Sequence, residues 1–297
     1  MALDITNDIK KTRLKNTILK KGFQGIDTKP EEIARFKWLN LDHSKELQSA
    51  QDLFHFMIDH PFMMMLPSDD SILPDMVSSL NGSIVFFSEY PKFAKKFEPV
   101  LSEFTSHFIQ KGLVFEYPLF QSTNILILKE HFLKLYHIKS ENMLLESDSK
   151  QILDFIKNNP SASKKLIRDA FRQQPNIFSK IDYHLYQLQM SMQIYKTGFD
   201  QINGSEFSLL SSVLPEINSV PDKRYLLDDV LESMIASSLF INPVQLQRAL
   251  KKLFDKSQVE SSLLNLQNSG KLYPIKLNKT VHLVHKETFD RVNILKS

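Results

Sequence analysis

The sequence predicts an α+β fold. Apolar residues recur at helical spacing in several segments, prolines interrupt these segments, and strand-like stretches with alternating apolar residues follow them. Three such helices followed by a β-ribbon occur twice, near residues 147–196 and 228–286. This order is typical of a winged helix, a variant of the helix-turn-helix. We therefore predict a mixed α/β N-terminal module at residues 47–140, followed by tandem winged-helix domains at 141–222 and 223–297.

The first part of the chain, residues 1–46, is predicted to be a basic helix and a linker. Residues 2–21 can place leucines and isoleucines on one helical face and lysines with one arginine on the other. The basic face suits the phosphate backbone of DNA, and a solvated surface helix is the alternative interpretation. Residues 22–30 predict the linker.

The mixed module alternates short helices with short apolar strands. Its predicted elements, in chain order, are a helix over 49–60 ended by Pro61, a buried strand at 62–66, a helix through Met76, Val77 and Leu80, a strand at 84–87, a helix through Leu101, Phe104 and Phe108 ended by Gly112, and strands at 113–117 and 124–128. The boundary to the next domain is expected at residues 139–146, which are largely polar.

The first winged-helix candidate begins with a helix capped by Ser147 or Asp148 and stopped at Pro160. Ser163 is the predicted cap of a second helix. A third helix then precedes a strand over 190–195 and a turn at 196–198. The side chains predicted to face inward are Leu166, Ile167, Ala170 and Phe171 on the second helix, and Phe178, Ile181, Leu185 and Leu188 on the third.

This module is the main candidate for nucleic-acid binding, because the third helix of a winged helix commonly enters a DNA major groove. Residues 147–196 hold eight lysines and arginines against four aspartates. The outward face of the third helix mixes groups suited to phosphates and base edges. A helical packing or protein-interaction module is the alternative interpretation. The residues predicted to contact DNA here are Lys164, Lys165, Arg168, Ser179, Lys180, Tyr183, Tyr186, Gln187 and Lys196. Asp182 is a candidate acceptor for a cytosine amino group, or a solvated helix charge.

The second winged-helix candidate repeats the same order. Asn242 and Pro243 are a favourable N-cap and first residue for its second helix, and Gly270 ends the third. A ribbon is predicted from strands at 271–276 and 280–285. The module is also basic, with eight lysines and arginines against five acidic residues over 228–286. Its predicted DNA contacts are Gln258, Ser262, Lys276 and Lys279.

Four segments together carry a resemblance to a known family. They are SAQDLFHFMIDHPFMMMLPSDDSILPDMVSS at 49–79, EFTSHFIQKGLVFEYPLF at 103–120, SKQILDFIKNNPSASKKLIRDAF at 149–171 and VESSLLNLQNSGKL at 259–272. In this order the chain resembles the winged-helix proteins grouped with the AlkZ and YcaQ DNA glycosylases, especially relatives without a clear catalytic Gln-x-Gln motif. In those relatives a mixed module with an LPS-like turn precedes two winged helices, and here the turn reads Leu73-Pro74-Asp75. The resemblance covers most of residues 49–286 and rests on spacing and apolar pattern.

The resemblance implies a DNA-binding architecture and raises base excision as an activity. The glycosylases of this group use a Gln-x-Gln or Gln-x-Asp motif near the N-terminus to position or activate water at the sugar, and the first module here has no match. Gln187-Leu188-Gln189 and Gln245-Leu246-Gln247 fit the letters but fall inside predicted winged-helix helices, so we do not transfer the role to them. The catalytic residue is therefore unknown, and enzymatic activity stays an open alternative.

Composition excludes other classes of protein. The chain has no cysteine, which excludes disulfides and thiolate metal sites and fits a reducing cytoplasm. No apolar run approaches the roughly 18 residues that cross a bilayer. Metalloprotease, nucleophile-elbow and phosphate-loop motifs are all absent from the sequence. The net charge of +3 is small, so a DNA-binding surface must be a local patch.

Together these observations predict a cytoplasmic protein, nucleoid-associated if bacterial, that binds double-stranded DNA and needs no cofactor, metal or membrane. A non-catalytic regulator or DNA-repair accessory is the first hypothesis. A DNA glycosylase that excises alkylated or crosslinked bases is the second. A protein-interaction scaffold is the third.

Overall fold

The computed structural model describes residues 3–4, 47–67, 73–82, 85, 87–120, 123–138, 145–200, 202–218, 226–238, 241–251, 253–277 and 280–288. The chain divides into two compact units, and the first is discontinuous in sequence. Unit 1 comprises Met1–Leu101 and Leu227–Ser297, and unit 2 comprises Ser102–Leu226. Helices mix with small antiparallel strand pairs, so the predicted α+β class is confirmed. The predicted division into four domains stays a prediction.

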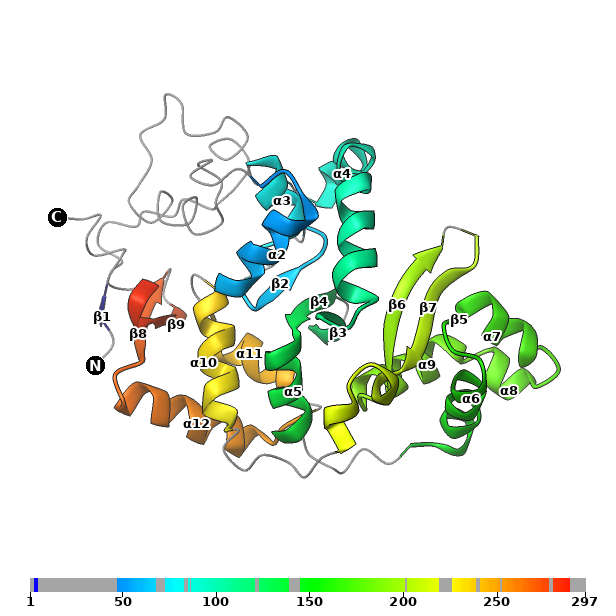
Figure 1. Ribbon diagram of the computed structural model, residues 1–297. Helices are drawn as coiled ribbons and strands as arrows, with labels where there is room; N and C mark the ends of the chain where they lie inside the picture. Colours follow the sequence, from blue (N-terminus) through cyan, green and yellow to red (C-terminus); the bar gives the residue numbers. More distant parts are fainter. Residues whose placement is uncertain are drawn as a thin grey trace. The chain divides into compact units, whose positions relative to one another are not determined.

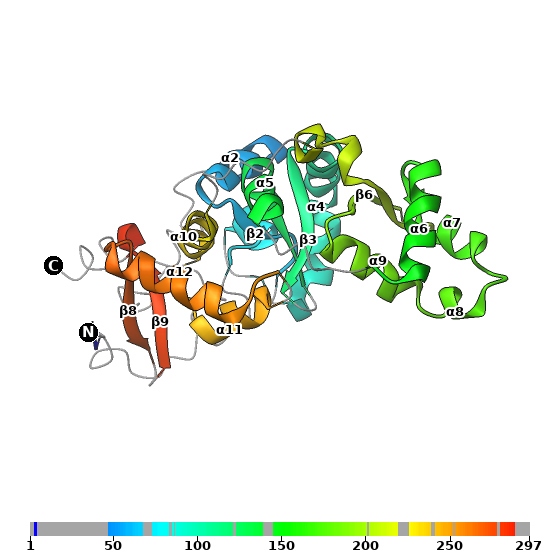
Figure 2. The same cartoon turned by 90° about the horizontal axis from the view of Figure 1, so that it is seen from below.

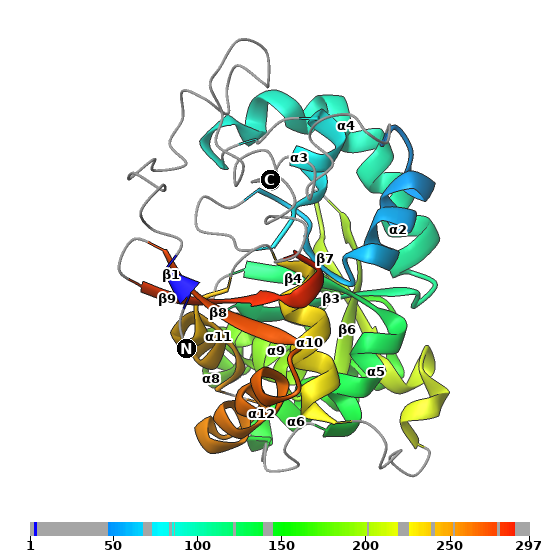
Figure 3. The same ribbon diagram turned by 90° about the vertical axis from the view of Figure 1, so that its left-hand side faces the viewer.

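Unit 1 contains the elements before residue 102 and after residue 226. They are β1 (Leu3–Asp4), α2 (Ala50–Asp59), β2 (Phe62–Met64), α3 (Met76–Asn81), a 3-10 turn (Phe87–Glu89), the greater part of α4 (Tyr90–Phe104), α10 (Leu227–Ser237), α11 (Pro243–Leu250), α12 (Lys256–Asn268), β8 (Leu272–Leu277) and β9 (Thr280–His285). Figure 3 shows α10, α11 and α12 grouped beside the β8–β9 hairpin.

The helix ends of unit 1 follow local capping rules. Ser49 and Asp52 form a capping box at the start of α2, because each side chain accepts from the other's backbone N–H. Asn242 caps α11 with Pro243 as its first residue, as predicted. Gly270 follows α12 with a φ of +73°, which is the left-handed conformation predicted there. Caps of this kind depend on one turn of the chain, so they can be predicted from the sequence.

Two predictions for unit 1 need correction. The helix expected from Ala2 does not include Leu3–Asp4, because these residues pair in parallel with β8. The remainder of that predicted helix lies outside the described residues. The strand expected at 84–87 is also wrong at its end, since Phe87 begins a 3-10 turn that leads directly into α4.

Apolar packing joins the two sequence-distant parts of unit 1. Helix α10 packs against β2, and the backbone N–H of Phe62 donates to the Ser237 hydroxyl at 3.3 Å. Helices α10 and α12 bury their apolar stripes against each other. Figure 2 shows α12 running alongside the β8–β9 hairpin. This order of three helices and a hairpin is the one predicted for the second module.

Unit 2 begins with the last residues of α4 and a π-helical turn, and its last described elements are two 3-10 turns. Its elements are the π turn (Thr105–Ile109), β3 (Val114–Phe120), β4 (Thr123–Leu128), α5 (Lys129–Ile138), α6 (Ser147–Asn158), β5 (Ala162–Ser163), α7 (Lys164–Ala170), α8 (Pro175–Phe178), α9 (Ile181–Met190), β6 (Ile194–Asp200), β7 (Gly204–Leu209) and the turns Leu210–Ser212 and Pro215–Asn218. Figure 1 shows α6, α7, α8 and α9 gathered around the β6–β7 hairpin.

A single apolar cluster holds the helices of this region together. Isoleucines from α6, α7, α8 and α9 meet there with Leu185, Leu188 and Phe207. Strands β5, β7 and β6 form a three-stranded antiparallel sheet in that order. The fully buried Tyr117 of β3 donates its hydroxyl to the Met190 carbonyl at 2.9 Å, which fixes the end of α9. Burial raises the pKa of Tyr117, so this donor stays protonated.

The structure corrects four details of the first module. Helix α6 has Glu146 as its N-cap, without a side-chain cap, instead of Ser147 or Asp148. The predicted third helix is split into α8 and α9 around Ser179 and Lys180. Three residues predicted to face inward are exposed: Leu166, Ala170 and Phe178.

The ribbon is the fourth detail, because its turn lies further along the chain than predicted. Strand β6 continues through Lys196 to Asp200, and a register shift between Lys196 and Gly198 accommodates one extra residue. Glycine is common both in bulges and in turns, so the sequence of this bulge resembles that of a turn. The hairpin instead reverses between Asp200 and Gly204.

Candidate nucleic-acid interface

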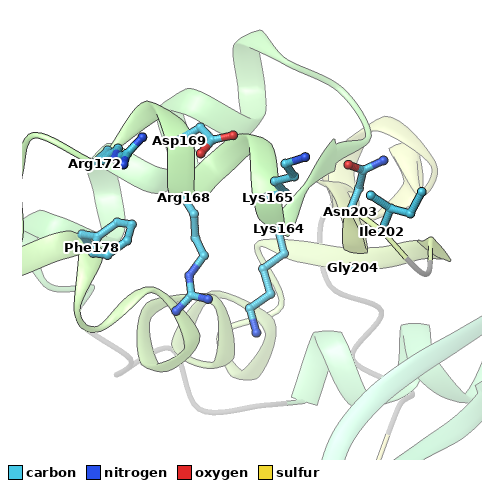
Figure 4. A pocket seen from close by; sticks show the side chains of 9 residues that line it. All are labelled: Lys164, Lys165, Arg168, Asp169, Arg172, Phe178, Ile202, Asn203 and Gly204. Atoms are coloured by element: carbon cyan, nitrogen blue, oxygen red, sulfur yellow. The ribbon is translucent and has the colours of Figure 1, made fainter.

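An open groove lined by lysines and arginines lies beside α7, and we name it the α7 groove. Its volume is about 580 Å³. Its lining residues, shown in Figure 4, are Lys164, Lys165, Arg168, Asp169, Arg172, Phe178, Ile202, Asn203 and Gly204. All of them belong to unit 2 and come from α7, the turn after it, α8 and the β6–β7 turn.

Helix α7 is held in place by its cap and by its buried face. The Ser163 hydroxyl accepts from the Leu166 backbone N–H at 3.1 Å, as predicted for an N-cap. Ile167 and Phe171 are buried in the apolar cluster of unit 2. The lysines and arginines of α7 therefore lie on the opposite, solvent-facing side, along one wall of the groove.

The β6–β7 turn is fixed against α7. The Asn203 carbonyl accepts from the Lys165 backbone N–H at 3.1 Å. Gly204 has a φ of +78°, a left-handed conformation that L side chains rarely adopt, so glycine permits the tight turn here. The Asp200 carboxylate accepts from the backbone N–H groups of residues 202 and 203, at 2.9 and 2.7 Å. The turn is thus preformed beside the cations.

Four cations and one carboxylate line the groove. Lys164 pairs with Asp182 of α9 at 2.5 Å, which offsets part of its charge and ties α7 to α9. The Arg168 guanidinium lies 5.7 Å from the centre of the Phe178 ring, in a cation–π arrangement. The groove keeps a positive excess, so its chemistry suits an anionic ligand.

Helix α9 presents the other predicted contacts of this module. Ser179 and Lys180 are exposed at the junction of α8 and α9, and Tyr186 and Gln187 are half-buried further along. Tyr183 is exposed, and its hydroxyl donates to the Glu146 carboxylate at 2.8 Å. That hydrogen bond raises the pKa of Tyr183. Lys164, Lys165 and Arg168 line the α7 groove itself, as a subset of the predicted contacts.

Lys196 lies apart from this surface because its amine is engaged inside unit 2. Its Nζ contacts both carboxylate oxygens of Glu116, at 3.0 and 2.9 Å. The side chains of Lys196 and Glu116 are only 19% and 8% exposed. Asn124 donates to the same carboxylate at 2.7 Å. The geometry therefore gives Lys196 a partner within the protein, and we leave it out of the proposed surface.

The predicted contacts of the second module are not brought together in the same way. Ser262 is 3% exposed and donates to Asp228, so it packs between α12 and α10. Gln258 is exposed, but its side chain accepts from the Asp255 backbone N–H at 2.9 Å as part of the α12 cap. Lys279 and the side chain of Lys276 lie outside the described residues.

Six groove residues were not among the predicted DNA contacts: Asp169, Arg172, Phe178, Ile202, Asn203 and Gly204. Arg172 carried a signal, since Lys164, Arg168 and Arg172 are spaced by four residues and such spacing aligns side chains on one helical face. Phe178 fitted the apolar period of the third helix, which hid the break between α8 and α9. Ile202 and Asn203 were missed because the hairpin turn was predicted at residues 196–198, whereas the chain reverses between Asp200 and Gly204.

The described residues offer little support for a metal site or for a transferred catalytic motif. They include no group of histidines and carboxylates that could hold a metal ion. Leu188 and Leu246, at the centres of the two Gln-x-Gln triplets, are fully buried, so each triplet straddles a core position. Within the described part of the chain, no helix is long and apolar enough to cross a membrane.

The comparisons with known proteins agree with the resemblance found in the sequence. No family model matches the chain, and no curated protein matches it. Among solved structures, the chain is similar to the Streptomyces sahachiroi DNA glycosylase AlkZ, with a TM-score of 0.51 and 10% sequence identity over 89% of this chain and 71% of that chain. The chain therefore has an AlkZ-like fold, and the predicted resemblance is confirmed. At this identity the similarity shows the fold and transfers no residue role.

Proposed function

We propose that this AlkZ-like chain binds double-stranded DNA through a winged helix formed by residues 145–209, as a cytoplasmic or nucleoid-associated regulator or repair accessory. Residues 227–285 form a second winged helix in this proposal. The α7 groove is the observation that carries it, because four lysines and arginines share one solvent-facing concavity with a single carboxylate, that of Asp169.

The element order around the groove supports this assignment. Helices α7 and α9 flank a short turn of helix, and the three-stranded β5–β7–β6 sheet follows them. In a winged helix the first of these helices contacts the backbone, the later one enters the major groove and the hairpin reaches alongside. In our proposal Lys164, Lys165, Arg168 and Arg172 anchor phosphates, and Lys180, Tyr183 and Gln187 of the α8–α9 region reach the groove.

A purely structural role explains the groove less well. Lysines and arginines on a packing surface are paired with carboxylates or covered. Lys165, Arg168 and Arg172 are exposed, and Asp169 is the one carboxylate that lines the groove with them. A protein-interaction scaffold remains the competing account if no nucleic acid binds.

The test is fluorescence anisotropy of a labelled duplex at several salt concentrations. Replacing Lys165 or Arg168 by Ala should weaken binding uniformly across sequences and reduce the slope of log K against log salt by about 0.9 for each phosphate that is no longer neutralised. Lys157→Ala is the matched control, because Lys157 is an exposed lysine of α6 that does not line the groove. Equal losses of affinity in all three variants, or no loss in any, would refute this placement of the interface.

Base excision is the second candidate function, and the AlkZ-like fold favours it. The structurally similar protein is named as a DNA glycosylase, an enzyme class that extrudes a base and cleaves its bond to the sugar. The test is incubation with alkylated and intact duplexes, followed by alkali to break any abasic sites. Breaks confined to alkylated DNA would establish excision, and intact strands after saturating binding would leave the non-catalytic function.

A further inference from the structure

Two exposed apolar side chains flank the cations of the α7 groove, and the phosphate contacts proposed for the duplex do not use them. Phe178 of α8 is 38% exposed and Ile202 of the β6–β7 turn is 80% exposed. Figure 4 shows Phe178 and Ile202 at opposite sides of the groove, with the side chains of Lys164 and Arg168 between them. Exposed apolar groups beside a cationic row suggest a ligand that is both anionic and apolar.

The Phe178 side of the groove is built to present a flat surface. The Arg168 guanidinium lies over the Phe178 ring, 5.7 Å from its centre, in a cation–π contact that brings the two groups together. Lys164 is held in a similar way by its ion pair with Asp182. Aromatic rings and guanidinium planes are the groups on which proteins stack unpaired bases.

On the opposite side of the groove, hydrogen bonds hold the backbone around Ile202 in place. Asp200 accepts from the Ile202 backbone N–H at 2.9 Å, and the next residue is hydrogen-bonded to Lys165. The isoleucine is therefore held outward instead of folding back onto the hairpin. An apolar group held in this position can cover a base face or wedge against one.

An intact, unbent duplex offers these apolar groups little surface, because its base faces are stacked inside and its outer ridges present phosphates. An unpaired nucleotide offers a phosphate and a free base face together. The groove, at about 580 Å³, lies within the range of pockets that hold ligands of nucleotide size, roughly 300–1,000 Å³. It is too open to enclose the ligand, which suits a strand that passes through.

We propose that the α7 groove holds unpaired nucleotides of DNA, such as those in a gap or a bulge, with phosphates on the α7 cations and bases against the Arg168–Phe178 pair and Ile202. This inference rests on the proposed function, since it names the form of DNA that the same site prefers. The chain then recognises DNA by interrupted base pairing, with no need for base-specific hydrogen bonds.

The experiment compares a labelled duplex with the same duplex carrying a short single-stranded gap, by anisotropy on the full chain. The wild-type chain should bind the gapped duplex roughly tenfold more tightly, which is the scale of one stacked base. Phe178→Ala and Ile202→Ser should each weaken binding of the gapped duplex more than binding of the intact duplex, and so remove most of that preference. Leu166→Ala is the matched control, because Leu166 is an exposed apolar residue of α7 outside the groove lining.

The outcomes separate the two proposals. Equal affinity for both duplexes, with the cation variants still weakening both, would overturn this inference and leave duplex binding standing. No binding to either duplex at low salt would overturn the proposed function and this inference with it. Ile202→Ser serves where Phe178→Ala loses its circular dichroism spectrum, because Ile202 makes almost no buried contact. A preference that Ile202→Ser leaves unchanged, or that Leu166→Ala also removes, would count against the groove.

Discussion

The partly buried ion pair between Lys196 and Glu116 allows a sharp test of which cations serve the fold and which serve binding. The substitution is Lys196→Met, which keeps the length of the side chain and removes its charge. Breaking one side of a buried pair costs about 3–5 kcal/mol, whereas an exposed pair contributes less than about 1 kcal/mol. The two side chains are 19% and 8% exposed, which is close to the buried limit.

Part of that cost is offset, because Asn124 still donates to the Glu116 carboxylate at 2.7 Å after the lysine is removed. We therefore expect Lys196→Met to lower the free energy of unfolding by about 2–3 kcal/mol. Urea unfolding followed by circular dichroism measures this change. A double-mutant cycle with Glu116→Gln isolates the coupling between the two side chains.

The expected coupling free energy is at least about 1 kcal/mol, and the folded variant should keep the wild-type salt slope for DNA. A coupling within about 0.5 kcal/mol of zero would refute the structural role of the pair. A reduced salt slope in Lys196→Met, comparable with that of Arg168→Ala, would place Lys196 on the DNA after all.

Three further predictions concern stability. Gly112→Ala should destabilise the fold by about 2–3 kcal/mol, because φ is +65° and the new Cβ would lie 2.3 Å from a Val213 methyl group. Gly270→Ala, with φ +73° and nothing within 4 Å, should cost only about 1 kcal/mol, and equal costs in urea unfolding would contradict this reasoning. Ser163→Ala removes the cap of α7 and should cost about 1 kcal/mol in thermal unfolding, whereas an unchanged midpoint would mean that the cap contributes nothing. Burial lowers the pKa of His131 from 6.5 to about 4, so the unfolded chain binds a proton that the folded chain does not, and stability falls as pH decreases through this window. Lowering the pH from 7 to 5 should reduce the free energy of unfolding by about 2 kcal/mol through this group, and His131→Leu should remove that part of the pH dependence. An unchanged pH dependence in His131→Leu would mean that the pKa of His131 is not lowered in the folded chain.

The sequence predicted the features of the fold that depend on a single turn of chain. Ser163 caps α7 and Asn242 caps α11 because one side chain and one backbone N–H settle each cap. Gly270 ends α12 for the same local reason. The α+β class followed from many such segments together, so errors in any one of them did not change it.

Features that depend on packing between distant segments could not be read from the sequence. The bulge near Thr197 looks like a turn in sequence, and only the pairing of β6 with β7 shows that the strand continues. Lys196 was assigned to DNA because nothing in the sequence places Glu116 beside it, eighty residues earlier in the chain. Phe178 was assigned to the core by its spacing, although a helix break turns it toward Arg168.

The candidate site was predicted in part. Lys164, Lys165 and Arg168 were identified from local charge, and they line the groove. Their neighbours Ile202 and Asn203 were missed, because their position beside α7 depends on where the hairpin reverses. The local density of charged residues can be predicted from the sequence, whereas the shape of a groove depends on how distant segments pack.

The insertion of unit 2 between the two parts of unit 1 has a consequence for synthesis of the chain. Unit 2 is one continuous segment and is complete once residue 226 has been made. The β2 segment of unit 1 must wait for α10, and its hydrogen-bonded partner Ser237 lies 175 residues after Phe62. At about 5–20 residues per second, that delay is on the order of ten seconds or more. During that time the apolar run Phe62–Met65 lacks the cover that α10 gives it in the folded chain, which prolongs the exposure of an aggregation-prone segment.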